Sequence, residues 1–280
     1  MDKKKDVVVL IGSGSIGQAI ARRMGAGRHV VVADLRVEAA DAAAKILTDA
    51  GFETSTIAVD ISSREAIRAL IRHALEFGEI KYMINSAGVS PSQAPVETIL
   101  KVDLYGTAVL LEEFGAVIAD GGSGVIISSQ SGHRLGNLPK AVSTALATTP
   151  TEELLGLDCI RAIDDTLKAY QYSKRCNALR TMYEATRWGK RGATINCISP
   201  GIVITPLAND ELNGPRKDGY RKMLSLAPAG RAGTPDEIGA LAEFLMGDHG
   251  RWISGTDYLI DGGTTASYWY GDLQYLKETH

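Results

Sequence analysis

Short apolar stretches rich in β-branched residues alternate with helical stretches along this chain. The first of them, DVVVLI at 6–11, is a continuous apolar run that ends in glycines, which is typical of a central parallel strand buried on both faces. A helical pattern follows, with Gly25 and Gly27 as its stop. Strands that alternate with helices of this length predict βαβ units with right-handed crossovers, and therefore a doubly wound α/β fold.

The same alternation continues into the C-terminal part of the chain. Strands are expected within 29–35, 54–61, 81–88, 124–129, 192–201 and 256–261, and helices within 37–51, 63–78, about 96–120, 169–176 and 234–247. Together with the first strand this makes about seven parallel strands flanked by helices. No linker or shift in composition divides the sequence, so residues 1–280 are expected to form a single domain.

The overall composition argues against several classes of protein. Hydrophobic residues make up 45% and charged residues 22% of the chain, and the net charge of −3 offers no basic field for nucleic acid. No apolar run reaches the roughly 18 residues that span a bilayer, and no apolar signal segment follows the N-terminal lysines, so a cytoplasmic protein is expected. Cys159, Cys176 and Cys197 are odd in number and lack metal-ligand spacing, which favours reduced structural thiols and no metal site.

The segment LIGSGSIG places Gly12, Gly14 and Gly17 in GxGxxG spacing, directly after the first strand and at the start of a helix. In a Rossmann fold such glycines allow a tight turn, a close approach to a pyrophosphate and close helix packing. Ser15 and Ile16 lie between them and are expected to contact the same dinucleotide. The pattern alone is weak evidence, because any glycine-rich turn can produce it.

A carboxylate at the end of the second strand supports the dinucleotide interpretation. Asp34 stands 22 residues after Gly12, where it can accept hydrogen bonds from ribose hydroxyls, and Leu35 follows it. Because this carboxylate would repel a ribose phosphate, NAD is preferred over NADP as the cofactor. Arg36 keeps NADP open, since a guanidinium can bind a phosphate, and Asp34 could also be a simple turn residue.

Six segments in order resemble the motifs of the short-chain dehydrogenase/reductase family, from about residue 6 to about residue 263. Besides the glycine loop, the matching segments are Asp60 with Ile61, NSAG at 85–88, IISSQSG at 126–132, YQYSK at 170–174, NCISPGIVIT at 196–205 and ISGTDYLIDGG at 253–263. The resemblance implies a Rossmann fold, an NAD(P)-dependent oxidoreductase and a homodimer or homotetramer. It also implies cofactor contacts from Asp60, Ile61, Asn85, Ser86, Ala87, Gly88, Tyr170, Lys174, Pro200, Gly201, Val203 and Thr205.

The stretch AYQYSKRC contains two tyrosines, and helix geometry separates them. At about 100° per residue, Tyr170 and Lys174 project within roughly 40° of each other, while Tyr172 points away. Hydride transfer to a carbonyl requires a proton on the oxygen, and a nearby ammonium favours the phenolate form of a tyrosine. The resemblance assigns the acid/base role to Tyr170, ribose binding to Lys174 and orientation of the substrate to Ser129. The alternatives are an exposed i,i+4 pair and a turn hydroxyl.

One motif position departs from the family. The family usually has asparagine in a helical V-N-x-x-G segment, where it supports a proton relay to the lysine, whereas this chain has KVDLYG with Asp103. A carboxylate keeps the shape but loses the NH₂ donors, and if buried near Lys174 it should pair with the ammonium or hold a proton. Our hypothesis is that Asp103 keeps a catalytic role with an altered pH dependence. A helix residue without any such role is the competing interpretation.

Ser129 and Tyr170 are 41 residues apart, a longer separation than is common in the family. The additional residues, about 134–167, form an insert in which Thr149, Pro150 and Glu152 predict a capping box and a short helix. We expect the insert to overhang the substrate site or an oligomer face. A similar insert occurs in bacterial 3α-hydroxysteroid dehydrogenase/carbonyl reductases, which the chain also resembles around TPL at 205–207 and GRAGTPDEIG at 230–239, a hint of bulky carbonyl substrates.

Two variable segments complete the predicted site. The loop after Gly201, with Thr205 and PLANDEL at 206–212, is expected to close over the ligand. The tail at about 264–280 carries four aromatic residues in SYWYGDLQYL, for which packing at a subunit interface is favoured over lining the pocket.

The sequence therefore predicts an NAD(H)-dependent oxidoreductase that interconverts a secondary alcohol and a ketone, with a small-molecule substrate. Three alternatives stay open: an NADP-dependent carbonyl reductase, a dinucleotide-binding regulator that has lost catalysis, and an epimerase or dehydratase that uses the same YxxxK pair. The short chain after Tyr170 argues against the last of these, because such enzymes usually carry a further substrate domain there.

Overall fold

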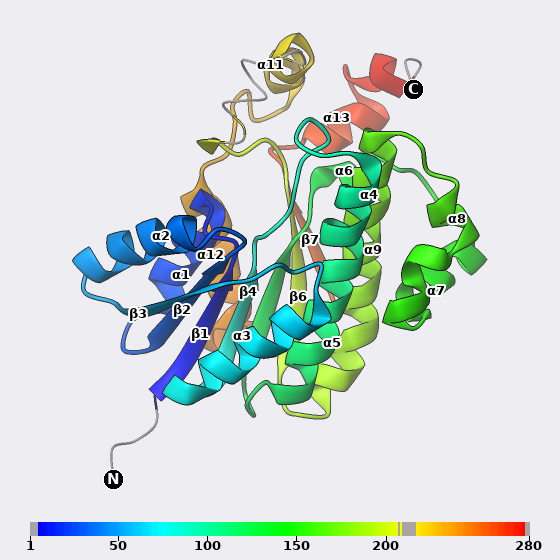
Figure 1. Cartoon of the computed structure of the whole chain (residues 1–280). Helices are drawn as coiled ribbons and strands as arrows, with labels where there is room; N and C mark the ends of the chain where they lie inside the picture. The colour runs from blue at the N-terminus through cyan, green and yellow to red at the C-terminus, as the bar shows by residue number, and fades with distance from the viewer. Residues whose placement is uncertain (1–4, 207, 209–216, 278–280) are drawn as a thin grey trace.

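A computed structural model describes residues 5–206, 208 and 217–277, and its centre is one parallel sheet (Figure 1). The predicted number of strands is confirmed, since seven strands pair in the order β3-β2-β1-β4-β5-β6-β7. The strands are β1 (Lys5–Ile11), β2 (His29–Asp34), β3 (Glu53–Ala58), β4 (Gly78–Asn85), β5 (Ser123–Ile127), β6 (Thr194–Pro200) and β7 (Asp257–Ile260). The order reverses between β1 and β4, which is where doubly wound folds form a crevice at the carboxyl edge of the sheet.

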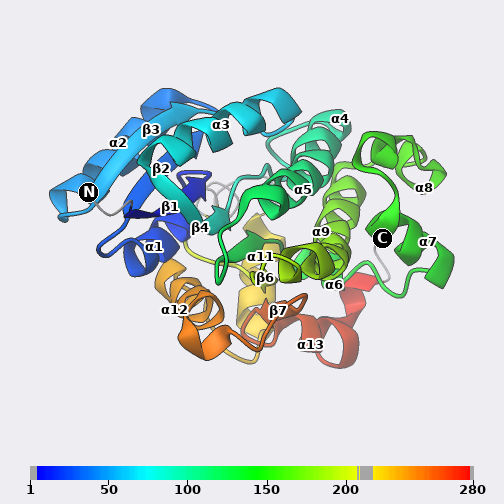
Figure 2. The ribbon, with the colours of Figure 1, turned by 90° about the horizontal axis from the view of Figure 1, so that it is seen from below.

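Helices cover both faces of the sheet, which confirms the predicted single-domain doubly wound fold (Figure 2). One face is covered by α1 (Ser15–Met24), α2 (Val37–Asp49) and α12 (Pro235–Met246), and the other by α3 (Arg64–Phe77), α5 (Thr107–Val117) and α9 (Thr166–Gly189). None of the described helices is long and apolar enough to cross a membrane. All three cysteines are free thiols, and Cys176 and Cys197 are buried.

Strand β1 shows why its sequence has no polar interruption. Val7 and Val9 pack into the core under α3 and α5, whereas Val8 and Leu10 pack into the core under α1 and α12. Successive side chains of a strand point to opposite faces, and here both faces are covered, so each position must be apolar.

The expected long helix around 96–120 is present as one continuous helical stretch over 96–117, but its middle is a π-helix that was not predicted. The segment divides into α4 (Val96–Ile99), the π-helix η1 (Leu100–Gly106) and α5. A π-helical turn is wider than an α-helical one, and it often marks a functional site. This wide turn carries Asp103 on its buried side, and a Cβ at Gly106 would lie only 2.7 Å from the carbonyl oxygen of Ile61.

The insert forms α7 (Lys140–Thr148), the 3₁₀-helix η2 (Thr151–Gly156) and α8 (Asp158–Arg161), which lie on the outer flank of α9 (Figure 1). A short helix is present, but the predicted capping box is wrong, because Pro150 is the N-cap of η2 and no side chain caps it. Thr149 instead ends α7, and its carbonyl oxygen accepts a hydrogen bond of 2.9 Å from Nη1 of the buried Arg180. Arg180 Nη2 also donates to Thr151 Oγ1 at 3.0 Å.

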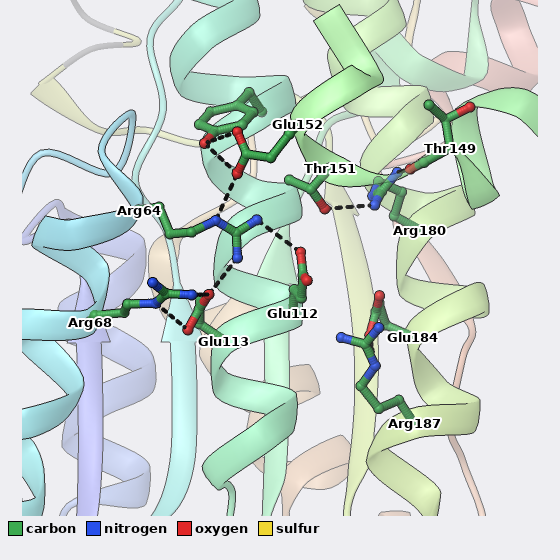
Figure 3. A network of polar contacts seen from close by, with 11 residues as sticks. Arg64, Arg68, Glu112, Glu113, Thr149, Thr151, Glu152, Arg180, Glu184 and Arg187 are labelled. Carbon is green, nitrogen blue, oxygen red and sulfur yellow. Dashed lines mark hydrogen bonds and ion pairs between the residues drawn. The ribbon is translucent and has the colours of Figure 1, made fainter.

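A second arginine ties the insert to the two helices α3 and α5 (Figure 3). The Arg64 guanidinium donates to Glu113, to Glu112 Oε2 at 3.0 Å and to Glu152 Oε1 at 2.7 Å. The Tyr105 hydroxyl donates to the same Glu152 carboxylate at 3.1 Å. The carboxylate that was expected to cap η2 therefore joins the insert to α3 and to the π-helical turn.

The C-terminal part covers the carboxyl edge of the sheet with α11 (Lys217–Leu226), α13 (Thr264–Tyr270) and η4 (Gln274–Lys277). Cations and aromatic rings hold these elements together: Lys222 Nζ lies 4.1 Å from the Tyr275 ring centroid, and Lys277 Nζ lies 4.6 Å from that of Trp269. Trp269 Nε1 also donates to the carbonyl oxygen of His133 at 3.1 Å. Much of the tail thus packs on its own chain.

Candidate active site

Loops from the carboxyl ends of β1, β4, β5 and β6 meet the side of α9 around a cavity of about 210 Å³. Many of the predicted site residues line it: Ile16, Ser86, Ala87, Gly88, Ser129, Tyr170, Lys174, Pro200, Gly201, Val203 and Thr205. The topology explains this convergence, because the carboxyl ends of parallel strands lie at one edge of the sheet.

The glycine loop is held against the loop that follows β4. Gly12 has φ of +84°, and a Cβ there would lie 2.5 Å from the Ala87 nitrogen. A Cβ at Gly17 would lie 2.3 Å from Ser86 Oγ, whose hydroxyl donates to the Gly12 carbonyl at 2.7 Å. A side chain at either glycine would push these loops apart, so two of the three motif glycines serve the packing of the protein itself.

Gly14 differs from these two, because a Cβ there would meet nothing within 4 Å. It is the N-cap of α1, and no side chain caps that end of the helix. No side chain therefore covers the first N–H groups of α1 at Gly14. These groups lie beside Ile16, which lines the cavity. This shape and polarity fit the pyrophosphate of a dinucleotide.

Asp34 ends β2 beside the glycine loop, as the spacing predicts. Its Oδ2 accepts hydrogen bonds from the Ser13 N–H at 2.9 Å and from the Ser13 hydroxyl at 2.7 Å. Leu35 is 68% exposed, and the exposed Arg36 side chain makes no hydrogen bond or ion pair with the residues that the structure describes.

Three predicted cofactor residues, Asp60, Ile61 and Asn85, do not line the cavity. Asp60 is exposed, and its Oδ1 accepts from the N–H of Ser62 at 2.9 Å, while Ile61 is buried in the core. Asn85 is also buried, and its Oδ1 accepts from the Ala87 N–H at 3.2 Å. Ile61 and Asn85 therefore shape the loops beneath the predicted cofactor site, and of the three only Asp60 faces solvent.

Tyr170 and Lys174 lie together on α9, and both line the cavity. Lys174 Nζ is 5.2 Å from the centroid of the Tyr170 ring. Tyr172 does not line the cavity; both tyrosines pack against the hydrophobic cluster shared by the insert and the 99–108 helix, and burial raises the pKa of the Tyr172 phenol. The helix geometry inferred from AYQYSKRC is therefore found in the structure.

Two adjacent serines follow β5, and their hydrogen bonds distinguish them. The Ser128 hydroxyl donates to the backbone oxygen of Lys174 at 2.7 Å, which joins β5 to α9. Ser129 is the N-cap of α6 (Gln130–His133), and its Oγ accepts from the Ser131 N–H at 3.1 Å. This leaves the Ser129 proton free to be donated into the cavity.

Asp103 is fully buried behind the cavity, where its Oδ1 accepts from the Val89 N–H at 3.0 Å and its Oδ2 lies 4.0 Å from Lys174 Nζ. Burial raises the pKa of Asp103 to about 6, against the opposing effects of Lys174 and Val89. Burial alone would lower the pKa of Lys174, but the charge of Asp103, with smaller contributions from Tyr170 and Cys197, raises it overall. A Cβ at Gly88 would lie 2.8 Å from Asp103 Oδ1, so the absence of a side chain at this glycine leaves room for Asp103 beside Lys174.

Thr205 lies at the rim of the cavity, and its Oγ1 accepts from the Ala208 N–H at 3.1 Å. The loop that was expected to close over the ligand falls largely outside the described residues, since 207 and 209–212 are among those not described. The described part of the insert, 134–167, contributes no residue to the cavity lining.

The cavity also contains residues that the motifs did not identify. Val89, Ser90 and Pro91 line one wall, and Gln130 and Tyr220 line others. Gln130 follows the motif serine directly, so its position in the sequence could have suggested it. Tyr220 comes from α11, 50 residues after Tyr170, and no spacing rule links the two.

Comparison with known proteins gives a consistent result across almost the whole chain. Residues 11–148 and 156–265 match the family model described as Enoyl-(Acyl carrier protein) reductase. A short-chain dehydrogenase/reductase, bsc3, from Alternaria brassicicola is 36% identical over 94% of this chain and 96% of the relative. A D-threitol dehydrogenase from Mycolicibacterium smegmatis is 33% identical over 95% of this chain and 94% of the relative.

The fold is also found among solved structures. A short-chain dehydrogenase/reductase from Serratia marcescens superposes with a TM-score of 0.73, covering 93% of this chain and 98% of that one at 24% identity. At this identity the likeness concerns the fold alone.

Proposed function

The chain belongs to the short-chain dehydrogenase/reductase family, and on that premise we propose that it is an NAD-dependent enzyme that interconverts a secondary alcohol and a ketone. At the coarser level it is an NAD(P)-dependent oxidoreductase of alcohols or ketones. The observation that supports the finer proposal most directly is the meeting of Tyr170, Lys174 and Ser129 on one cavity.

Tyr170 is the acid/base of the proposed reaction. A bound nicotinamide dinucleotide would supply or accept the hydride. During reduction the Tyr170 hydroxyl donates its proton to the substrate oxygen, and during oxidation it recovers that proton. The Ser129 hydroxyl donates a hydrogen bond to the same oxygen, since its own oxygen accepts from the Ser131 N–H. Together the two hydroxyls orient the carbonyl and stabilise charge that develops on it.

Lys174 serves the phenol and the cofactor. Its ammonium, 5.2 Å from the Tyr170 ring centroid, stabilises negative charge on the phenol oxygen. Its other proposed partner is the nicotinamide ribose. Asp103 lies 4.0 Å behind the ammonium and is proposed to keep it charged and to pass protons to it. This retains the relay role of the usual asparagine with a group that can itself titrate.

The glycine loop and Asp34 are proposed to hold the dinucleotide. Gly14, Ser15 and Ile16 would receive the pyrophosphate, and the Asp34 carboxylate would accept hydrogen bonds from the adenosine ribose, which favours NAD. An NADP-dependent carbonyl reductase is the second candidate, because the exposed Arg36 side chain, which has no ion-pair partner among the described residues, could bind a ribose phosphate. Asp60, Ile61, Asn85 and the Pro200–Thr205 segment would complete the cofactor site.

The substrate class, the cellular location and the oligomeric state are also proposals. The D-threitol dehydrogenase relative acts, by its name, on a polyol, which supports a small hydroxylated substrate. The resemblance to bacterial 3α-hydroxysteroid dehydrogenase/carbonyl reductases suggested a bulky one, but the insert on which it partly rests lines no part of the described cavity. We further propose a cytoplasmic homodimer or homotetramer, as is usual in the family.

Substitution of Tyr170 by phenylalanine tests the proposal. Tyr170→Phe keeps the ring beside Lys174 but removes the acid/base, so turnover should fall by about 10²- to 10⁴-fold while NADH binding, followed by fluorescence, is retained. The matched control is Tyr172→Phe on the same helix, which should keep the wild-type rate. Alcohol oxidation should be assayed with NAD⁺ and NADP⁺ in parallel, with a lower KM expected for NAD⁺. Unchanged turnover in Tyr170→Phe would refute the mechanism.

A further inference from the structure

His133 ends the short helix α6, which follows Ser129, and it is not among the residues that line the cavity. Its Nε2 lies 2.8 Å from Oδ2 of Asp257 on β7, and the two side chains are 24% and 15% exposed. Because a carboxylate only accepts, the imidazole is the donor. Of the four residues of α6, His133 is the one whose side chain makes a hydrogen bond to another element in the described part of the chain.

The carboxylate of Asp257 is itself held in place. Asp257 begins β7 and lies opposite Cys197 of β6, whose side chain belongs to the core on the face of the sheet that α9 covers. Its second oxygen, Oδ1, accepts from the Ser199 hydroxyl at 2.7 Å. A largely buried carboxylate is costly unless it is hydrogen-bonded, and here Ser199 and His133 each serve one oxygen. The end of α6 is therefore bound to a fixed acceptor on the sheet.

A helix as short as α6 depends on such contacts for its position, because isolated helices below about 12–15 residues are marginal in water. Its start follows Ser128, whose hydroxyl is bonded to α9. Its middle packs closely on α9, since a Cβ at Gly132 would lie 2.8 Å from the Arg175 nitrogen. Its end is held by the His133 side chain on β7 and by Trp269, which donates to the His133 carbonyl oxygen at 3.1 Å. The imidazole is thus the side chain through which α6 is attached to the sheet.

The single turn of α6 connects the position of His133 to that of Ser129. The Ser131 N–H donates to Ser129 Oγ at 3.1 Å, and the Gly132 N–H donates to the Ser129 carbonyl oxygen at 3.0 Å. Both N–H groups belong to the turn that His133 ends, so a movement of this turn changes the direction of the Ser129 hydroxyl. A group that acts on a reacting oxygen must be held within about 0.5 Å of its productive position. A shift at the end of α6 therefore reaches the reacting oxygen, although His133 does not touch it.

We propose that His133 is a positioning residue of the reaction: its hydrogen bond to Asp257 holds α6 in place and thereby directs the Ser129 hydroxyl to the substrate oxygen. The inference rests on the proposed function, because it takes Ser129 to bind that oxygen. A contact that only stabilised the fold would change the rate equally with or without the Ser129 hydroxyl. A positioning contact changes the rate only while that hydroxyl is present, and this difference can be measured.

A double-mutant cycle, followed by NADH formation from NAD⁺ with D-threitol as the probe alcohol, tests the inference. His133→Leu should lower kcat about 10-fold and leave the KM for NAD⁺ within about 2-fold, because only the hydroxyl is misdirected. Ser129→Ala should lower kcat about 10²-fold, and addition of His133→Leu to it should change kcat by less than about 2-fold. His133→Gln, whose amide can replace the imidazole N–H, should restore kcat to within about 3-fold of the wild type. His249→Leu, at an exposed histidine, is the matched control and should keep the wild-type rate.

Hydrogen exchange gives a second measurement that requires no turnover. The Ser131 and Gly132 amides should exchange about 10-fold faster in His133→Leu and at the wild-type rate in His133→Gln, while the amides of α3 are unchanged in both. Asp257→Asn removes the carboxylate from the other side and should produce the same acceleration.

Equal losses of kcat when His133→Leu is added to the wild type and to Ser129→Ala, or unchanged exchange of the Ser131 and Gly132 amides, would each overturn the inference. A general fold defect is recognised by faster exchange in α3 and would overturn it as well. If the wild type oxidises no alcohol but the exchange rates change as expected, the proposed reaction fails and the attachment of α6 by His133 stands.

Discussion

At the scale of single residues, Asp103 is a buried group whose charge can change within a moderate pH range. It is fully buried, it has one N–H donor, and its second oxygen has no hydrogen-bond partner among the described residues. Burial raises its pKa from the ordinary 3.8 to about 6. Below that pH the carboxyl is neutral, and above it the carboxylate faces the Lys174 ammonium.

Replacement of Asp103 by asparagine should remove a pH-dependent step. We expect wild-type kcat/KM for alcohol oxidation to rise as pH increases through about 6, because ionised Asp103 holds the Lys174 ammonium in place. Asp103→Asn should lose that limb, and its plateau should fall by about 10-fold, equivalent to about 1.4 kcal/mol. Superimposable pH-rate profiles would exclude Asp103 from the mechanism.

Stability provides an independent measure of the same titration. A carboxyl whose pKa is higher in the folded state binds its proton more tightly there, so its contribution to stability is full below pH 3.8 and is lost as pH rises through about 6. In the wild type, ionisation of Asp103 therefore lowers the free energy of unfolding as pH rises from about 3.8 to above 6. Asp103→Asn should lack that decrease, which urea unfolding at a series of pH values would reveal.

Single residues also show how far sequence reasoning reaches. The Tyr170–Lys174 pair follows from helix geometry, because both belong to one continuous helix and their relative angle is local. The contact between Asp103 and Lys174 could be predicted only on the condition that Asp103 is buried near the lysine. Whether it is depends on how the π-helical turn packs against α9. Gln130 could have been suggested by its position directly after Ser129, whereas Tyr220 was missed because no local rule says which later helix faces the cavity.

At the scale of elements, the insert is held by two arginines that lie outside it, the buried Arg180 and the partly buried Arg64. Arg180, 3% exposed on α9, donates to the carbonyl oxygens of Leu146 and Thr149 and to the Thr151 hydroxyl. Arg64 at the start of α3 binds Glu152 (Figure 3). The insert thus depends on buried polar contacts as well as on its apolar cluster.

Arg180→Met should loosen the insert. The substitution removes the guanidinium donors from the Leu146 and Thr149 carbonyl oxygens and from the Thr151 hydroxyl, and Leu146 keeps only the weak Cys176 thiol at 3.4 Å, which should cost about 2 kcal/mol. Hydrogen exchange of residues 140–156 should accelerate, and the free energy of unfolding should fall. Arg161→Met, at an exposed position on α8, should change neither measurement. Wild-type protection of the insert in Arg180→Met would show that its apolar cluster is sufficient.

Some elements of the fold could be predicted from the sequence and others could not. The inner strands were the easiest to predict, because a strand buried on both faces needs an unbroken apolar run, as in Val7–Ile11. The π-helical turn could not be predicted, because its seven residues carry ordinary helix-forming patterns and its extra width comes from tertiary packing. The capping box failed for a related reason: Glu152 had a stronger distant partner in Arg64 than the local N–H groups offered.

At the scale of the whole molecule, Trp188 joins two helices to the sheet. It is fully buried near the end of α9, its Nε1 donates to the Leu111 carbonyl of α5 at 3.0 Å, and its ring occupies space left by Gly115 and Gly124. The helix that carries Tyr170 and Lys174 is therefore anchored to α5 and to β5 at the end far from the cavity.

Trp188→Ala should destabilise the whole fold. Loss of a fully buried tryptophan removes a large apolar surface and leaves a cavity, which costs about 3–5 kcal/mol. Denaturant unfolding at matched protein concentration measures this change. Trp252→Ala, at a position that is 99% exposed, is the control and should alter the free energy of unfolding by no more than about 0.5 kcal/mol. Similar effects of the two substitutions would contradict the anchoring role.

The cation and aromatic contacts that join η4 to α11 have a practical consequence. Tyr220, which lines the cavity, belongs to the same helix as Lys222, and Lys222 rests on Tyr275 of the tail. Lys5 begins β1 at the opposite edge of the sheet (Figure 1). For immobilisation on a biosensor, or for fusion to a reporter, attachment ahead of Lys5 should leave the cavity accessible. Attachment beyond Lys277 would instead place the fused group next to α11, the helix whose Tyr220 lines the cavity.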